Sequence, residues 1–281
     1  MFNQMANEIE KRRKVEDALR LALAELEQLK RRPPGDCAYP RHDMIADLSH
    51  DLRTPITLIQ GYLDTVLVKE ASMAAPERRA YVAFAAKQSR DLGALVEELI
   101  EFVKLDYEGY RIHPEAVHLG ELGRDVLQAF GLAAETRGVT LVAEIEAGIG
   151  FVQADIGLIE RALRNLIGNA LAHSSWGGEI RLSVHSRNDG IELRVSDTGD
   201  GIAVEELPHV FERHFRGEAT RRRDSGGAGL GLAIVKRILQ LHRGDIRVKS
   251  VSGKGTDFCF TLPARGESPM LDTNECKFPW S

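Results

Sequence analysis

The stretch DLSHDLRTP, residues 47–55, places a histidine, a carboxylate and a hydroxyl within about two turns of one predicted helix. Apolar residues recur three and four positions apart along this helix, which predicts one buried stripe: Ile45, Leu48, Leu52, Ile56, Ile59, Leu63 and Val66. His50 lies midway between two stripe residues, so at ~100° per residue it points away from the stripe on which a core histidine would lie. Asp51 can hold one ring nitrogen protonated and leave the other with a free lone pair, which makes His50 a candidate nucleophile. Thr54 lies one turn further on the same face, and Pro55 is expected to bend the helix.

A second group of residues, in the C-terminal half, has the chemistry of a metal and nucleotide site. Asn165 and Asn169 are four apart in RALRNLIGNALAHS and share one helix face. An asparagine carbonyl is a hard oxygen ligand, suited to Mg²⁺ that also holds phosphate oxygens and waters. In VSDTGDGI, Asp197 ends a predicted strand, where its carboxylate could accept a hydrogen bond from an adenine amino group. Gly199 and Gly201 would let the backbone pass close to the base.

Two further patterns complete this group. The run VFERHFRG sets aromatic and basic side chains around a turn: Phe211, Arg213, Phe215 and Arg216. The run GGAGLGLAIVK places glycines at the start of a helix, where free amides and the helix dipole attract phosphate: Gly226, Gly227, Gly229 and Gly231. Each pattern alone has an ordinary explanation, such as solvated helix groups, a hairpin turn or a common helix start. Their combination in this order indicates a nucleotide site.

The elements that must position these residues fall into two regions. The first holds a helix over 41–70, a break around 74–76, and a second striped helix that ends before a linker at 107–114. Beyond the linker, strands and helices alternate without a Rossmann glycine pattern, which favours a mixed sheet covered by helices on one face. The predicted elements are helices at 119–137, 156–173 and 230–241, strands at 139–145, 151–154, 179–186 and 191–196, and a hairpin of 245–250 with 256–262.

The two striped helices cannot bury their apolar faces as a lone hairpin, whereas a homodimer that forms a four-helix bundle can. Residues 1–32 contain neither Pro nor Gly and carry apolar residues alternately four and three apart, which predicts a parallel coiled coil. Residues 266–281 have no period and are predicted to be disordered.

Composition bounds the remaining possibilities. A chain of 281 residues with 43% hydrophobic residues suits one or two domains and a linker. The net charge of −5 gives the chain no overall positive potential that would attract a phosphate backbone, so we expect no nucleic-acid partner. Three cysteines without paired spacing indicate reduced thiols, and no run approaches the ~20 apolar residues of a membrane span. We therefore expect a soluble, cytoplasmic polypeptide.

SHDLRTP resembles the H box of sensor histidine kinases of the two-component type, in the HisKA dimerisation class. The four downstream patterns resemble the N, G1, F and G2 boxes of the family's ATP-binding domain, HATPase_c. That domain has the Bergerat fold, shared with type II topoisomerase, MutL and heat-shock chaperone ATPases. The resemblance covers residues 47–263 and implies a dimeric helical hairpin followed by an α/β sandwich. On this basis 37–108 is the dimerisation and phosphotransfer domain, and 115–265 is the catalytic domain with a mobile lid at 217–227.

The resemblance also implies roles for individual residues. His50 would accept phosphate from ATP, Asp51 would orient its ring, and Asn169 would bind Mg²⁺. The implied nucleotide-binding residues are Asn165, Asn169, Asp197, Gly199, Gly201, Ile202, Phe215, Arg216, Gly227, Gly229, Leu230, Gly231 and Thr256. The partner would be the receiver domain of a response regulator, whose aspartate takes the phosphoryl group, and Thr54 matches the family pattern for removing it. FNQMANEIE resembles the end of a HAMP module, which implies that the chain is the cytoplasmic portion of an inner-membrane sensor, anchored upstream of residue 1.

Two alternatives stay open. An ATPase of the same superfamily would carry a general-base glutamate four residues before the metal-binding asparagine; this chain has Asn165 there, which cannot take a proton from water. A catalytically weak dimeric scaffold is disfavoured by the presence of His50, Asn169 and Asp197. The scaffold alternative stays open because this chain has Ala172 where the family usually has Lys or Arg, which removes one phosphate contact. Arg213 or Arg216 could supply the missing cation.

Overall fold

The structure, a computed structural model, describes residues 41–69, 72–107, 109–188, 190–213, 215, 217 and 229–263, and for residues 41–51 it gives the helix without its side chains. The predicted coiled coil at 1–32, most of the predicted lid, and the predicted disordered tail at 266–281 lie outside these residues. The chain divides near residue 103 into two compact units, each of which is described by itself.

The first unit is a helical hairpin. Helix α2 (Arg41–Val68) continues through Pro55, and helix α3 (Ala75–Asp106) has Pro76 in its first turn, where the missing amide hydrogen costs no helical bond. The two helices lie side by side, and Tyr62 of α2 contacts two rings of α3 with centroid distances of 5.3 and 4.3 Å. The sequence predicts a buried stripe on α3, and four of its residues are buried: Ala85, Leu92, Leu99 and Phe102. Its other three residues, Tyr81, Gln88 and Leu95, are half-buried.

The second unit is built on a five-stranded mixed sheet in the order β2-β4-β5-β7-β6. Its strands are β2 (Thr140–Ile145), β4 (Glu179–Arg187), β5 (Gly190–Asp197), β6 (Asp245–Val251) and β7 (Gly255–Pro263). Only β2 and β4 are parallel; the other pairs are antiparallel. A short strand β1 (Glu115–Val117) pairs with β3 (Val152–Ala154).

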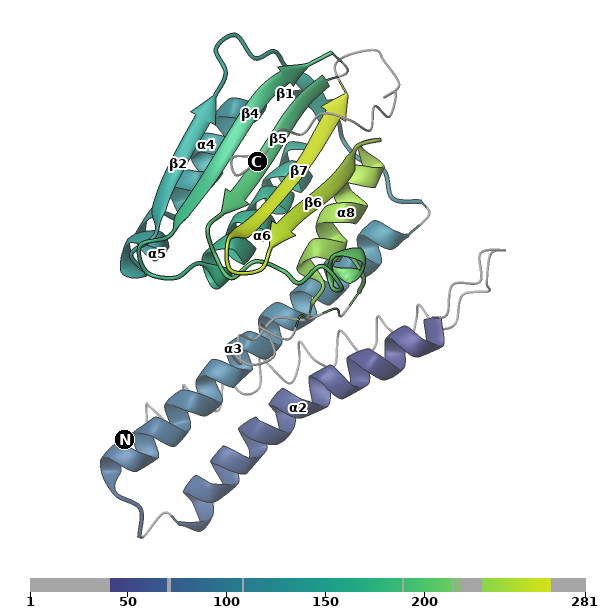
Figure 1. Cartoon of the computed structure of the whole chain (residues 1–281). Coiled ribbons are helices and arrows are strands. Elements are labelled where there is room, and N and C mark those ends of the chain that lie inside the picture. Colours follow the sequence, from purple (N-terminus) through teal and green to yellow (C-terminus); the bar gives the residue numbers. More distant parts are fainter. Residues whose placement is uncertain are drawn as a thin grey trace. The chain divides into compact units, whose positions relative to one another are not determined.

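Three helices cover one face of this sheet: α4 (Leu119–Ala129), α6 (Ile156–His173) and α8 (Gly231–Leu241) (Figure 1). The core between the layers comes from alternate residues of the strands and from one side of each helix, as the predicted one-sided mixed sheet requires. Fully buried examples are Leu182, Leu193, Phe258, Ile159, Leu163 and Ile234.

The prediction of one helix over 119–137 is wrong. The segment forms α4 and a second helix, α5 (Gly131–Thr136), which meet at Phe130. The Phe130 amide bonds to the Leu127 carbonyl three residues back, which tightens the last turn of α4 and redirects the chain. The sequence does not predict strand β1 or the short 3₁₀ helix η1 (Leu207–His209).

His242 fixes the ends of two helices that the site uses. Its Nε2 accepts a hydrogen bond from the Asp155 amide (2.9 Å), and its Nδ1 lies 2.7 Å from the Ile238 carbonyl in α8. These two contacts require the neutral ring with the proton on Nδ1. Asp155 in turn caps the start of α6 through the Leu158 amide (3.2 Å). Burial lowers the pKa of His242, so the neutral form is also the favoured one.

We expect His242 to make the folded state acid-sensitive. In the folded protein the pKa of His242 lies below the ~6.5 of an unfolded histidine. Its contribution to the free energy of unfolding is therefore fully present above about pH 6.5 and is lost as the pH falls through the folded pKa. In calorimetry between about pH 5 and pH 8, the Tm of the wild type should fall more steeply on acidification than that of His242→Gln. Parallel curves for the two proteins would show that His242 does not carry this dependence.

Candidate functional site

The predicted phospho-acceptor lies on α2, the first helix of the hairpin. His50 and Asp51 are within the part of α2 whose side chains are not described. Thr54, one turn beyond His50, is exposed on the same helix. Their predicted roles remain predictions.

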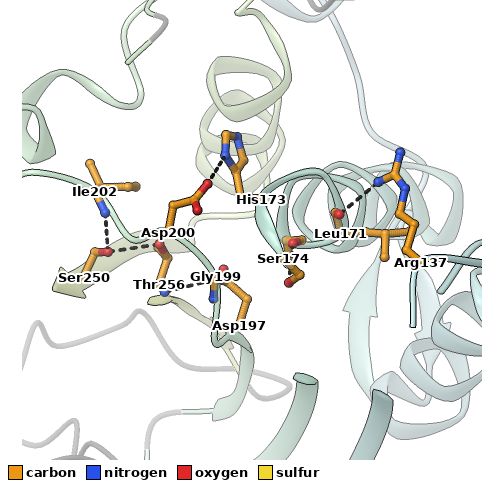
Figure 2. A network of polar contacts seen from close by, with 11 residues as sticks. Arg137, Leu171, His173, Ser174, Asp197, Gly199, Asp200, Ile202, Ser250 and Thr256 are labelled. Atoms are coloured by element: carbon orange, nitrogen blue, oxygen red, sulfur yellow. Dashed lines mark hydrogen bonds and ion pairs between the residues drawn. The ribbon is translucent and has the colours of Figure 1, made fainter. Parts of the chain in front are cut away.

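Asp197, the last residue of β5, is the centre of a polar network in the second unit (Figure 2). Its Oδ1 accepts hydrogen bonds from the backbone amides of Gly199 (2.8 Å) and Thr256 (3.2 Å). Among the described residues none bonds to Oδ2, so this oxygen is available to a ligand. Burial raises the pKa of Asp197 to about 6; the two amides oppose this shift, while the charges of Asp200 and Asp257 add to it.

Thr256 is buried, and its hydroxyl contacts Ser250 across the β6–β7 pair at 3.0 Å. The Ser250 hydroxyl also accepts from the Ile202 amide (2.8 Å), so it ties the loop after β5 to the hairpin (Figure 2). Ser250 was not among the predicted site residues. The predicted hairpin did hold the signal, because its register places Ser250 directly opposite Thr256.

The glycines of the loop after β5 have a structural reason of their own. A side chain at Gly199 would collide with the carbonyl of His173, at the end of α6. Gly201 has a φ of +67°, and a side chain there would collide with the Val251 carbonyl. The sequence predicts that these glycines admit a base; the structure shows that close approach of the protein's own backbone requires them.

The two asparagines of α6 have different surroundings. The amide nitrogen of Asn165 donates to the carbonyl of Gly231 (3.3 Å), the first residue of α8, which joins the two helices. Asn169 is half-buried, and within the described chain its side chain makes no hydrogen bond, so its carbonyl can serve as a ligand. In the described regions no three His, Cys, Asp or Glu side chains are placed so that together they could hold a metal ion. This donor set fits Mg²⁺ held by one amide oxygen, phosphate oxygens and waters, rather than by a protein cage.

The start of α8 has no side-chain cap among the residues that the structure describes. Leu230 occupies the N-cap position, is fully buried and gives no side-chain hydrogen bond to the first turn. Gly229, with a φ of +65°, turns the chain into the helix. Amides that no side chain caps are suited to phosphate oxygens.

The aromatic and basic turn is only partly described. Phe211 packs against Phe258 of β7, with ring centroids 6.1 Å apart, and Phe215 stacks on His209. Arg213 forms an ion pair with Asp106 (3.1 Å), so in this structure it does not take over the role of the missing cation at Ala172. Arg216, Gly226 and Gly227 lie outside the described residues.

Two family models match the chain. Residues 41–108 match the His Kinase A (phospho-acceptor) domain, and residues 154–266 match the histidine kinase-, DNA gyrase B- and HSP90-like ATPase. The predicted fold, a helical hairpin followed by an α/β domain of the Bergerat type, is thereby confirmed.

Individual relatives agree with the two models. The chain is 33% identical to the sensor-like histidine kinase SenX3 of Mycolicibacterium smegmatis over 79% of its own length and 57% of that protein. Its structure resembles Acinetobacter baumannii histidine kinase AdeS, with a TM-score of 0.62, 25% identity, and coverage of 77% of this chain and 98% of that one. It also resembles full-length ShkA in complex with AMPPNP, with a TM-score of 0.59, 26% identity, and coverage of 79% and 45%.

The chain thus spans little more than half the length of its curated relative SenX3. Among the helices that the structure describes, none has the length and apolar run that crossing a membrane requires. The order of the two matched domains, together with these relatives, establishes that the chain belongs to the sensor histidine kinases of two-component systems.

Proposed function

We propose that this chain is an ATP-dependent protein-histidine kinase that phosphorylates His50 and passes the phosphoryl group to an aspartate of a response regulator. The observation that carries the proposal is the environment of Asp197. One carboxylate oxygen is held by two backbone amides, and the other is left for a ligand donor such as the adenine amino group. The AMPPNP complex of ShkA supports the choice of nucleotide.

In the proposed reaction a ring nitrogen of His50 attacks the γ-phosphorus of ATP. The nitrogen–phosphorus bond forms as the bond to the bridging oxygen of ADP breaks, and the carboxylate of Asp51 accepts the proton from the other ring nitrogen. Uncapped amides at the start of α8 would bind phosphate oxygens, and Asn169 would hold Mg²⁺, which neutralises phosphate charge. A regulator carboxylate then attacks the phosphorus, and the bond to His50 breaks.

Stability of the label distinguishes this proposal from its alternatives. After incubation with γ-labelled ATP, we expect label on the protein that is lost in acid and retained in alkali, as a phosphorus–nitrogen bond requires. Acid-stable label would indicate a hydroxyl acceptor. Release of phosphate without label would indicate an ATPase, and neither label nor release would indicate a scaffold.

We also propose that the chain dimerises through residues 41–107. The described part of the α2 stripe supports this: Leu52, Ile56, Ile59, Leu63 and Val66 are all only half-buried in the single chain. A second copy could cover them in a four-helix bundle. A monomer in sedimentation at micromolar concentration would contradict this proposal.

The third proposal concerns dephosphorylation of the regulator. Thr54 is exposed and lies four residues after His50 on α2, about 5–6 Å along the helix. Its hydroxyl could position water against an acyl phosphate. We expect Thr54→Ala to keep autophosphorylation and transfer but to slow the loss of phosphate from the regulator in the presence of ADP by about tenfold or more.

Thr57→Ala is the matched control, because Thr57 is also exposed on α2 but lies about 10 Å of helical rise beyond His50, two turns away instead of one. The control should clear the phosphorylated regulator at the wild-type rate. If all activities and the Tm of Thr54→Ala fall together, Thr54 has a structural role only.

A further inference from the structure

Asp200, in the loop after β5, was not among the predicted site residues. Its carboxylate Oδ2 lies 3.8 Å from Nδ1 of His173, the last residue of α6 (Figure 2). Both side chains are largely shielded from water, at 27% and 23% exposure. The contact therefore lies in partly desolvated surroundings, where an ion pair is screened less than on an open surface.

The backbone of Asp200 is held from two sides. Its amide donates to the carbonyl of His173 (3.3 Å), and its carbonyl accepts from the amide of Gly253 (2.6 Å), in the turn between β6 and β7. The loop thus lies between the end of α6 and the β6–β7 turn. The side-chain contact of Asp200 with His173 adds a second link on the α6 side.

His173 is suited to carry a positive charge in this position. It lies in the last turn of α6, where the carbonyl end of the helix dipole favours a cation. The carboxylate of Asp200 favours the same protonated ring. Two other acidic groups lie near this contact: Asp197, and Asp257, whose charge acts on Asp197; both are buried.

The contact joins the two halves of the proposed nucleotide site. Asn169, the proposed Mg²⁺ ligand, lies one turn before His173 on α6, and Asp197 lies three residues before Asp200. We propose that Asp200 is a positioning residue that, through His173, holds the adenine-binding loop against the end of α6 and thereby sets the affinity for ATP. This inference rests on the proposed nucleotide binding.

The test measures equilibrium binding of a fluorescent ATP analogue to the full chain, so it does not depend on kinase activity. We expect Asp200→Asn to weaken binding about fivefold, the loss of one partly shielded ion pair. Asp200→Glu should stay within about twofold of the wild type, because the longer acid can still reach His173. Asp245→Asn, which removes an exposed carboxylate from β6, is the matched control and should bind as the wild type does.

A double-mutant cycle with His173→Gln decides whether the two residues act together. If they do, Asp200→Asn combined with His173→Gln binds no more weakly than either single variant. The inference would be overturned if the double variant lost affinity by the product of the two single-variant factors. It would also be overturned if Asp200→Asn bound the analogue as tightly as the wild type. The pH profile gives an independent readout: without the Asp200 charge the pKa of Asp197 falls, so the acid midpoint for binding should move to lower pH.

Failure of this inference is distinguishable from failure of the proposed function. If the wild type itself binds no adenine nucleotide, nucleotide binding is wrong, and the inference falls with it. If the wild type binds and Asp200→Asn binds equally well, only the role of Asp200 is wrong. A fall in Tm that accompanies weaker binding by both Asp200→Asn and Asp200→Glu would mean that Asp200 only stabilises the fold.

Discussion

Replacing His50 by Gln is expected to reduce covalent labelling from γ-labelled ATP to background. Glutamine keeps a polar side chain of similar reach on α2, but its amide nitrogen has no lone pair available for attack on phosphorus. Nucleotide affinity should be unchanged, because the proposed ATP site belongs to the other compact unit. Label is measured by filter binding, and affinity with the fluorescent ATP analogue.

His185→Gln is the matched control for this substitution. His185 lies on β4, is partly exposed and pairs with Glu146 at 3.7 Å, with no proposed part in the reaction. It should label at the wild-type rate. Sedimentation of His50→Gln should match that of the wild type, which excludes loss of assembly as the cause. Undiminished, acid-labile labelling of His50→Gln would assign the acceptor to another histidine.

Replacing Asp197 by Asn is expected to weaken ATP binding by about 10- to 100-fold, the effect of ~1–3 kcal/mol for a mismatched buried polar group. The reason is the orientation of the side chain. Two backbone amides donate to Oδ1, and only an oxygen can accept from them, so the Asn amide nitrogen must take the other position. It would then present a donor to the donor of an adenine amino group.

The same geometry predicts a change of specificity. A 6-oxo purine presents an acceptor where adenine presents a donor, so Asp197→Asn should bind inosine triphosphate better, relative to ATP, than the wild type does. If Asp197→Asn binds ATP as tightly as the wild type, Asp197 does not recognise the base. Loss of affinity without any change in preference would point to damage to the loop instead.

The pKa of Asp197 provides a further check. Since burial raises it to about 6, binding of ATP by the wild type should weaken as the pH falls through that value, whereas Asp197→Asn should show no such step. The variant is not expected to unfold. A folded pKa above the unfolded value means that ionisation costs stability as the pH rises through about 6, and Asn removes this cost.

The sequence by itself determined the order and type of most elements. Apolar spacing located α3 through its buried stripe, and the bounds predicted for α6 agree with those observed, because both helices are long and strongly periodic. Alternation likewise located β4 and β5. It failed at β1 and at the division of α4 from α5, where a single tightened turn at Phe130 redirects the chain.

The residue types of the candidate site were also predictable, because few side chains can bind a base, a metal or a phosphate. What only the tertiary structure decided is how these residues are joined. Asn165 connects α6 to the start of α8, and Ser250 connects β6 to the loop after β5.

The contact between His173 and Asp200 is of the same kind. Such contacts link residues that are distant in the chain, and their partners are set by how helices and strands pack rather than by any local period. For that reason the sequence could indicate which residues are candidates for the site, whereas only the fold shows that two backbone amides hold one carboxylate oxygen of Asp197.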